Sequence, residues 1–542
     1  MTVLVDLPEK GITTKNDRRG EKAVKRVFKV IKSYRDPITK KPKVKETLIG
    51  KLDDETGKLI PNENYYKYYD SNNSSNYESQ LVTELRTGDF QCLNVGFIGA
   101  CFKLAKNYKL LQTLQQIFGK ELAEGFLYLA IYTLENGSVM SYYPRWALSR
   151  GLDDKFTYSS REISRILQSI SKEDKLDFLN SWFKIHHSDK YLAYNVTSIS
   201  SYNQQMYDIA RGYNRDGEDL PQINLGVIYD QDSRLPLYYD IYRGNIPDKA
   251  YLETTISLAL SLNINKLNLV MDQGFYTKDN IKYLHSKGTN FLTLLPKNNK
   301  LYKELLNDVK ANPYDFIKEY DIKYKIFARS YIKVNEGIKS KVIMSYSQAE
   351  HTYLAESLLD KVERNNVDLN LISNKRGLVV KKLMKYHEVK QEGDVLISYK
   401  EYKYKIHEEY SKMGYFALIT NDLDLEPLEI LSIYHEKNII EKCFYNLKNI
   451  IDFVRLGTHS AETTEGKVFV TFISLILISI LRNLLRESNV LHTYTTKDII
   501  QHLNDIRCIR TKNELIKQGL NKDQKIVLEH LKLELSDVIP KS

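Results

Sequence analysis

The feature that most constrains the fold of this chain is a run of alternating strand and helix patterns between residues 191 and 295. Segments rich in β-branched and aromatic residues come first, and helical patterns then alternate with short apolar strands. The predicted order is strand 191–199, strand 223–229, strand 235–242, helix 249–262, strand 266–271, helix 278–286 and strand 290–295. Three antiparallel strands that lead into a parallel strand–helix–strand unit predict one mixed sheet covered by helices.

This order, β-β-β-α-β-α-β, is typical of an α/β ribonuclease-H-like core. The pattern breaks between residues 298 and 412, where short strands are mixed with one helix near 349–365. A further core strand at 414–420 and a helix at 429–449 follow. We therefore predict a ribonuclease-H-like core that is interrupted by a β-rich insertion and then completed.

The 542 residues exceed one ordinary hydrophobic core, so we expect several domains. Strand-like alternation at 25–32 and turn signals at Asp36-Pro37 and Thr56-Gly57 favour a small β meander. The predicted division is a basic β segment and linker (1–75), a helical domain (76–188), the first part of the core (189–297), the insertion (298–412), the second part of the core (413–485) and a helical C-terminal tail (486–542). The helical domain is the expected DNA-binding domain, although a plain helical packing domain fits this segment equally well.

Composition narrows the class of protein. The net charge of +10 and the pI near 8.9 suit a polyanionic partner, but charge alone does not establish nucleic-acid binding. The N-terminus shows no basic segment followed by an apolar run, which predicts no secretory signal. The longest apolar run, 468–481, is too short to span a bilayer and predicts a buried helix. The four cysteines form no CxxC pair, which argues against a zinc ribbon and fits a cytoplasmic location.

The first candidate for chemistry is an acid at a strand end. Asp272 follows the apolar residues Val270 and Met271 and precedes Gly274. An acid at the carboxyl edge of a strand points toward the crevice where open α/β sheets bind ligands. An acidic loop residue or a helix cap would give the same local pattern.

The second candidate is a polar stripe on the predicted helix 429–449. Four polar residues recur there at helical spacing: Tyr434, Lys437, Glu441 and Lys448. At about 100° per residue they fall within one sector of about 60°. The opposite side carries Ile439, Ile440, Cys443 and Leu447. We expect the apolar side to pack on the core, although a solvated helix face has the same spacing.

Taken together, Asp272 and Glu441 suggest metal chemistry. A two-metal nuclease needs carboxylates from separate chain segments that converge on two divalent ions about 4 Å apart. Lysines beside such acids can hold the phosphates of a DNA strand.

These motifs resemble the bacterial insertion-sequence DDE transposases whose signature is Y-(2)-R-(3)-E-(6)-K. The matching residues are Tyr434, Lys437, Glu441 and Lys448. Lys437 stands in the arginine position, where it keeps the charge but loses the two-pronged contact with phosphate. Asp272 matches the second catalytic aspartate of the family and Glu441 its glutamate. Segments 239–248 and 33–57 also resemble the family, so the resemblance covers nearly the whole chain.

The resemblance implies a DNA transposase that binds the terminal inverted repeats of its element, cuts DNA as a metal-dependent endonuclease and transfers strands to target DNA. The implied catalytic residues and metal ligands are Asn195, Asp272 and Glu441, with two Mg²⁺ or Mn²⁺ ions. The implied DNA contacts are Tyr434, Lys437 and Lys448. The resemblance also implies double-stranded DNA as the partner, a homodimer in the DNA complex and a location at the bacterial nucleoid. We expect no membrane partner and, without a phosphate-binding glycine loop, no nucleotide cofactor.

One residue departs from the family pattern. The first catalytic aspartate should lie in the first core strand, and Asn195 occupies that position in the segment 194–198. An asparagine offers a carbonyl oxygen to a metal but brings no negative charge, and its NH₂ group repels a cation. Three explanations of Asn195 compete: the insertion sequence has decayed, the residue has been changed deliberately to trap a complex, or a nearby acid takes the place of the missing aspartate. Asp230 and Asp240 are the nearest acids, and substitution is the explanation we favour least.

Two further sets of residues invite functional readings. The resemblance implies that an aromatic ring of the insertion stacks on a flipped base, which is physically sound. The candidates are Tyr302, Tyr314, Phe316, Tyr320, Tyr324, Phe327 and Tyr331. The histidines His186, His187 and His435 lack partners at metal-ligand spacing, so we expect structural roles for them.

Two rival functions stay open. A catalytically inactive protein that still binds the ends of its element would carry Asn195 without penalty, and a cleavage assay with Mg²⁺ or Mn²⁺ separates it from an enzyme. A nuclease that does not transpose would share the same core, and strand-transfer products separate it from a transposase.

Overall fold

The computed structural model describes most of the chain. The described residues are 4–18, 23–35, 42–53, 56–69, 91–203, 209–261, 267–313, 316, 318–372, 383–393, 395–488, 493–510 and 515–539. The predicted turn at Asp36-Pro37, most of the predicted linker and Tyr314 lie outside these residues.

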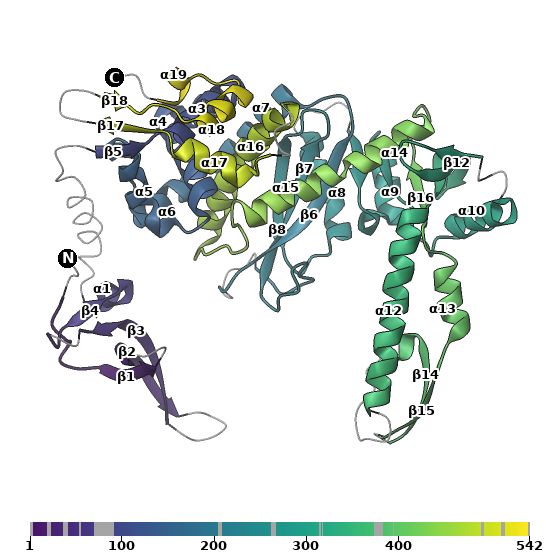
Figure 1. Ribbon diagram of the computed structural model, residues 1–542, viewed down its shortest axis with the longest axis horizontal. Coiled ribbons are helices and arrows are strands. Elements are labelled where there is room, and N and C mark those ends of the chain that lie inside the picture. The colour runs from purple at the N-terminus through teal and green to yellow at the C-terminus, as the bar shows by residue number, and fades with distance from the viewer. Residues whose placement is uncertain are drawn as a thin grey trace.

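A nine-stranded mixed sheet forms the centre of the molecule, in the order β11-β12-β13-β16-β10-β9-β6-β7-β8 (Figure 1). Six of its strands come from the predicted core: β6 (Leu192–Ser200), β7 (Gln222–Asp230), β8 (Pro236–Arg243), β9 (Asn268–Met271), β10 (Asn290–Leu294) and β16 (Tyr415–Thr420). β6, β7 and β8 are antiparallel neighbours, whereas β9 and β10 run parallel to β6. Strands and helices follow each other in the predicted order. Every residue of β7 is buried, as expected for a strand covered on both faces.

Helices cover both faces of this sheet. On one face lie α8 (Asp248–Ser261) and α9 (Lys278–Ser286), and the Tyr194 hydroxyl of β6 is 3.4 Å from Thr255 Oγ1 of α8. On the other face lie α14 (Pro427–Glu436), α15 (Asn438–Asn449) and α16 (Ala461–Glu487), and the ring of Tyr239 packs against Phe472 of α16. Because side chains alternate along a strand, Tyr194 and its neighbour Asn195 point to opposite faces. Asn195 therefore faces the side of α15.

The predicted insertion does not lie wholly outside the core. Its strands β11 (Tyr320–Asp321), β12 (Ile326–Asn335) and β13 (Ile338–Ser347) continue the central sheet through β16 (Tyr415–Thr420), which pairs with both β10 and β13. The sequence pattern is local and does not report this long-range pairing. Helix α10 (Lys300–Ala311) precedes these strands. An arm made of α12 (Gln348–Ile372), the hairpin β14 (His387–Glu392) and β15 (Val395–Glu401), and α13 (Lys403–Tyr410) projects from the sheet (Figure 1).

The N-terminal segment forms its own small sheet. The strands β1 (Ile12–Arg18), β2 (Ala23–Arg35), β3 (Pro42–Leu52) and β4 (Leu59–Pro61) pair in sequential antiparallel order, and α1 (Glu63–Tyr69) follows. The predicted meander is therefore present. Its small core of Val27, Ile49 and Leu59 is separate from the main core.

The region before the central sheet is helical, as predicted. After the short strand β5 (Gln91–Asn94) come α3 (Gly96–Asn107), α4 (Leu110–Asn136), α5 (Tyr143–Ser149), α6 (Ser160–Gln168) and α7 (Lys172–His186). Helix α16 packs against α4 and α6. Among the described residues only α16 is long and apolar enough to cross a membrane, and its apolar window is 89% buried inside the protein. The apolar run 468–481 is therefore part of a core helix.

The prediction of a purely helical C-terminal tail was wrong. Helices α17 (Thr496–Asn504), α18 (Lys522–His530) and α19 (Leu535–Val538) are present, but so are the strands β17 (Arg507–Arg510) and β18 (Leu515–Lys517). β17 pairs antiparallel with β5, so the end of the chain returns to the helical region (Figure 1). A four-residue strand has too little local pattern to be recognised, and its partner lies far away in the sequence.

Candidate active site

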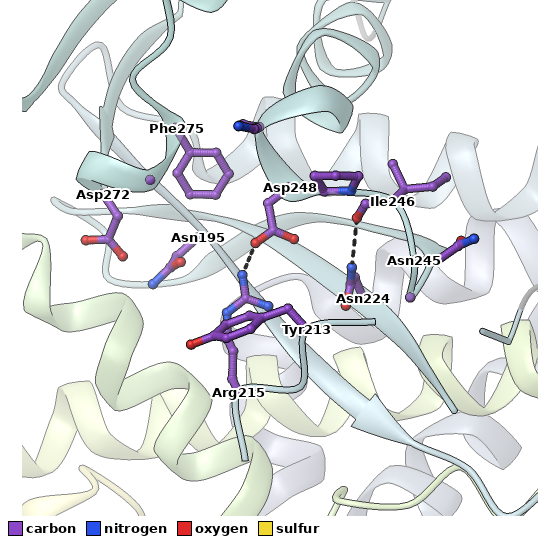
Figure 2. A pocket seen from close by; sticks show the side chains of 13 residues that line it. Asn195, Tyr213, Arg215, Asn224, Asn245, Ile246, Asp248, Asp272 and Phe275 are labelled. Carbon is purple, nitrogen blue, oxygen red and sulfur yellow. Dashed lines mark hydrogen bonds and ion pairs between the residues drawn. The ribbon is translucent and has the colours of Figure 1, made fainter. Parts of the chain in front are cut away.

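Asn195 and Asp272 are neighbours because of the strand register. β6 and β9 pair in parallel, with Tyr194 opposite Met271, so the next residues on the two strands, Asn195 and Asp272, are level. Adjacent strands lie about 4.8 Å apart. Both side chains line one cavity of about 470 Å³, and they lie next to each other in Figure 2. The sequence-predicted first and second positions therefore meet.

The end of β9 holds the Asp272 side chain at the cavity. β9 stops at Met271, and a short 3-10 turn, Gln273–Phe275, follows Asp272. Phe275 is buried, and its ring centroid is 5.0 Å from that of Tyr194. The contact between Phe275 and Tyr194 holds the turn against the sheet. The Asp272 carboxylate therefore projects from the end of β9 while the residues after it are packed.

Lys437 links Asp272 to Glu441. Its ammonium group forms a very short ion pair with Asp272 Oδ1 and lies 3.5 Å from Glu441 Oε1. The lysine side chain is only 4% exposed, whereas those of Asp272 and Glu441 are 38% and 58% exposed. Because one nitrogen contacts both carboxylates, the two acids lie within about two hydrogen-bond lengths of each other. Two carboxylates from separate segments therefore converge here.

The predicted helix 429–449 is two helices that meet at Lys437. This residue ends α14 and begins α15, and its backbone stays right-handed helical. The Tyr434 ring lies 5.6 Å from the Lys437 ammonium. Burial, and then the charges of Asp272 and Glu441, raise the pKa of Tyr434. On the opposite side Ile440, Cys443 and Leu447 are buried, as the helical pattern predicted, whereas Ile439 is only partly buried and lines a cavity.

Lys448 lies apart from this group. Its ammonium donates to both carboxylate oxygens of Asp216, at 2.7 and 2.6 Å, in the segment between β6 and β7. Three of the four stripe residues therefore gather at the carboxylates, while the fourth ties α15 to a neighbouring loop.

Asn195 already uses its side-chain oxygen. Asn195 Oδ1 accepts a hydrogen bond of 2.8 Å from the backbone N–H of Val196. Among the described residues no group of three or more His, Cys, Asp or Glu lies together in a way that could hold a metal ion. Asp272 and Glu441 supply the oxygen donors that Mg²⁺ prefers, and the Lys437 ammonium supplies the positive charge between them. The donor set fits a divalent cation but is one carboxylate short.

Neither Asp230 nor Asp240 replaces the first acid. Asp230 accepts hydrogen bonds from the backbone and hydroxyl of Ser188, both at 2.8 Å, at the far end of β7. Asp240 is level with Val196 across β7 and accepts a hydrogen bond of 2.9 Å from the Tyr251 hydroxyl. Since Val196 and Asn195 face opposite sides of the sheet, Asp240 points away from Asn195.

The cavity also contains charged residues that sequence reasoning missed. Asp248, at the start of α8, forms a close ion pair with Arg215 (Figure 2). Asp248 also accepts a hydrogen bond of 2.5 Å from the Tyr242 hydroxyl. Asp248 ends the segment 239–248 that resembled the family, which was a usable signal. Arg215 lies between predicted strands, where no periodic pattern exists to single it out.

The aromatic candidates of the insertion have different environments. Tyr302 and Phe316 are buried, and the Tyr331 hydroxyl donates to Asp308 at 2.6 Å. Tyr324 instead lines a second cavity of about 770 Å³ that Tyr434 also lines. Of the described candidates, Tyr324 thus lies in a cavity that reaches the candidate active site.

The histidines have neighbours typical of structural residues. His186 Nε2 is 3.0 Å from the carbonyl oxygen of Tyr108, and burial lowers the pKa of His186. His187 Nδ1 is 3.7 Å from Asp230 Oδ2. The ring of His435 lies beside that of Tyr324.

Residues 184–477 match a protein-family model described as a transposase DDE domain, which covers more than half of the chain. No curated protein matches. Among solved structures, a piggyBac transposase synaptic complex with hairpin DNA is similar, with a TM-score of 0.37 and 9% sequence identity over 74% of this chain and 78% of that chain. A likeness this low carries no inference about this chain. The matched family range spans Asn195, Asp272 and Glu441.

Proposed function

Because this chain belongs to the family of proteins with a transposase DDE domain, we propose that it binds the terminal inverted repeats of an insertion sequence and that its site performs metal-dependent DNA cleavage and strand transfer. The observation that carries the proposal is the convergence of Asp272 and Glu441 on Lys437, beside Asn195. The family acts on DNA, and double-stranded DNA is the partner. The finer assignment to the group with the Y-(2)-R-(3)-E-(6)-K signature is part of the same proposal.

DDE transposases generally use divalent metal ions. In this chain Asp272 and Glu441 would hold Mg²⁺ or Mn²⁺, with Asn195 at the third position. When bound, two such ions would activate the attacking oxygen and stabilise the leaving oxygen of the phosphodiester. Lys437 keeps the carboxylates together through its contacts with both, and Tyr434 and Lys448 are proposed to position DNA.

We further propose that the five strands β6 to β10 and their helices form a ribonuclease-H-like core. In support, β8-β7-β6-β9-β10 is a run of three antiparallel strands followed by two parallel ones, with helices on both faces. The acids then lie at the carboxyl end of β9 and on a helix that crosses β6. A homodimer in the DNA complex and a place at the nucleoid belong to this proposal.

Asn195 should limit the activity. A pair of divalent ions carries four positive charges, and this site offers two carboxylates to balance them. The alternative function, an inactive protein that binds the ends of its element, rests on this one residue.

Restoring the missing carboxylate tests the proposal. We expect Asn195→Asp to raise Mg²⁺- or Mn²⁺-dependent cleavage of DNA that carries the sequences flanking the gene, by at least about tenfold, since each 1.4 kcal/mol of transition-state stabilisation is worth that factor. Asn224→Asp is the matched control, because Asn224 lines the same cavity but lies on β7. Binding without any cleavage in Asn195→Asp would support the inactive DNA-binding protein, and cleavage without strand-transfer products would support a plain nuclease.

A further inference from the structure

A second charged cavity lies beside the carboxylates, on the adjacent face of α15. Its volume is about 320 Å³, and its lining includes the cations Arg234, Lys442 and Arg486. Arg234 is in the turn between β7 and β8, Lys442 is on α15, and Arg486 is in the last turn of α16. Three separate elements therefore bring positive charge to one hollow.

These three cations have no acidic ion-pair partner in the part of the chain that the structure describes. Among the described residues no ion pair or hydrogen bond joins the side chain of Arg234, Lys442 or Arg486 to a carboxylate. Glu436 is the single acid in the lining, and its charge also acts on Lys190 and Lys323. The lining also includes His435 and Gln231, and the Gln231 amide donates to the Ile433 carbonyl at 2.9 Å.

The two arginines of the cavity repel each other. Burial and the nearby guanidinium of Arg234 lower the pKa of Arg486, and Arg482 adds to the effect. Arg482 lies one helical turn before Arg486 on the same face of α16 and donates to Asn446 Oδ1 at 2.7 Å. Three cations held beside the single acid Glu436 leave an excess of positive charge that costs free energy, and an anion bound between them reduces this cost.

The position of the cavity identifies the anion. The cavity side of α14 and α15 carries His435, Asn438, Ile439 and Lys442, and the adjacent side carries Tyr434, Lys437 and Glu441. Each cavity residue follows a residue of the carboxylate side by one position, as Lys442 follows Glu441. The two sets of side chains therefore lie next to each other along the same helices. DNA carries about one negative charge per 1.7 Å of its axis, so a strand at the carboxylates has further phosphates near the cavity.

We propose that Arg234, Lys442 and Arg486 form a phosphate-binding subsite that holds the DNA backbone beside the cleavage site. The statement that the bound phosphate belongs to DNA rests on the proposed function, whereas the anion-binding character of the cavity does not. Arginine forks match the oxygens of a phosphodiester, and Lys442 adds a point charge at the exposed rim.

The test measures DNA binding in EDTA, where cleavage cannot contribute. The full chain and Lys442→Gln/Arg486→Gln are titrated with a short duplex of arbitrary sequence at salt concentrations between about 50 and 200 mM. Each phosphate contact contributes about 0.9 to the slope of log K against log salt, so the double variant should lose about 1.8 from the slope and bind more weakly. Lys282→Gln, an exposed lysine of α9 on the opposite face of the sheet, is the control and should keep the slope.

Further variants and a second ligand keep the result interpretable. Arg486→Lys preserves the charge and should keep the slope, and Lys442→Gln alters only an exposed side chain, so its loss of about 0.9 does not depend on core packing. An unchanged slope in folded Lys442→Gln overturns the proposal. Titration with inorganic phosphate tests whether the subsite binds free phosphate instead of DNA. If phosphate binding requires Arg486 while the salt dependence of DNA binding is unchanged in the variants, the subsite does not bind the DNA backbone. A slope change in a chain that never cuts DNA leaves the subsite supported while the proposed catalysis fails.

Discussion

Two adjacent faces of α15 differ in how their clustered charges are paired. On one face the buried Lys437 ammonium lies between Asp272 and Glu441, so one positive charge is shared by two carboxylates. On the adjacent face Arg234, Lys442 and Arg486 face one cavity without an ion-pair partner among the described residues. The first arrangement pairs its two acids with one cation of the chain, whereas the second gains its counter-charge from an anion outside the chain.

This difference separates chemistry from binding. The carboxylates need a cation, and Lys437 supplies one until a metal ion competes for the same oxygens. The basic cavity needs an anion, and a DNA backbone supplies many. The same helix thus carries residues suited to bind a metal ion and residues suited to bind phosphate. This arrangement suits an enzyme that must hold a DNA strand while it cuts it.

The largest expected effect comes from removing a carboxylate. In the Asn195→Asp background, Asp272→Asn should lower metal-dependent cleavage by roughly a thousandfold or more, as for other residues that act as one catalytic unit. Asp248→Asn is the matched control, because Asp248 lines the same cavity but pairs with Arg215. Product formation at saturating Mn²⁺ measures both, and equal losses in the two variants would refute the distinction drawn between these acids.

A smaller effect is expected from removing the internal cation. Lys437→Gln leaves Asp272 and Glu441 facing each other, so without metal the free energy of unfolding should fall by about 1 kcal/mol, a value discounted because both acids are partly exposed. Mg²⁺ should then raise the melting temperature of Lys437→Gln more than that of the unaltered chain, because binding to the folded state stabilises it. Lys437→Arg should behave like the unaltered chain, and equal Mg²⁺ responses in all three would contradict competition between Lys437 and metal.

A pH-dependent effect is expected from Lys467, a buried lysine whose ammonium contacts a backbone carbonyl and, among the described residues, no carboxylate. Its ammonium donates to the Leu456 carbonyl at 2.6 Å, and burial lowers the pKa of Lys467 from 10.5 to about 8. The unfolded chain then binds the proton more tightly, so this lysine makes stability rise between about pH 8 and 10.5. Lys467→Met should flatten that rise in urea unfolding measured across this range, and an unaltered pH profile would mean that Lys467 keeps its ordinary pKa.

Much of the fold was predictable because its signals are local. The strand and helix order between residues 191 and 295 follows from hydrophobic periodicity, and the N-terminal meander follows from alternation and turn residues. The joining of β12 and β13 to the central sheet, and of β17 to β5, was not predictable. These strands pair with partners far away in sequence, and periodicity reports only which faces are apolar, not which strand lies next to them.

The candidate site divides in the same way. The residue types and spacing at Asp272 and Glu441 marked both acids, and the helical spacing of Tyr434 and Lys437 put them on the same face. Nothing in the sequence indicated that Lys437 would be buried between the acids, or that Arg215 and Asp248 would share the cavity. The basic cavity was missed altogether, because its cations come from three elements that no local pattern connects.

The sequence by itself determined the order of the secondary-structure elements, the chemical character of the residues at positions 195, 272 and 441, and the family of the chain, since all of these are written in local patterns and motifs. Only the tertiary structure decided which charges meet: the parallel register of β6 and β9 sets Asn195 level with Asp272, and the packing of α15 directs Glu441 and Lys442 to different neighbours. The physical reason is that electrostatic interactions depend on distances across the fold, and those distances are set by long-range strand pairing and helix packing.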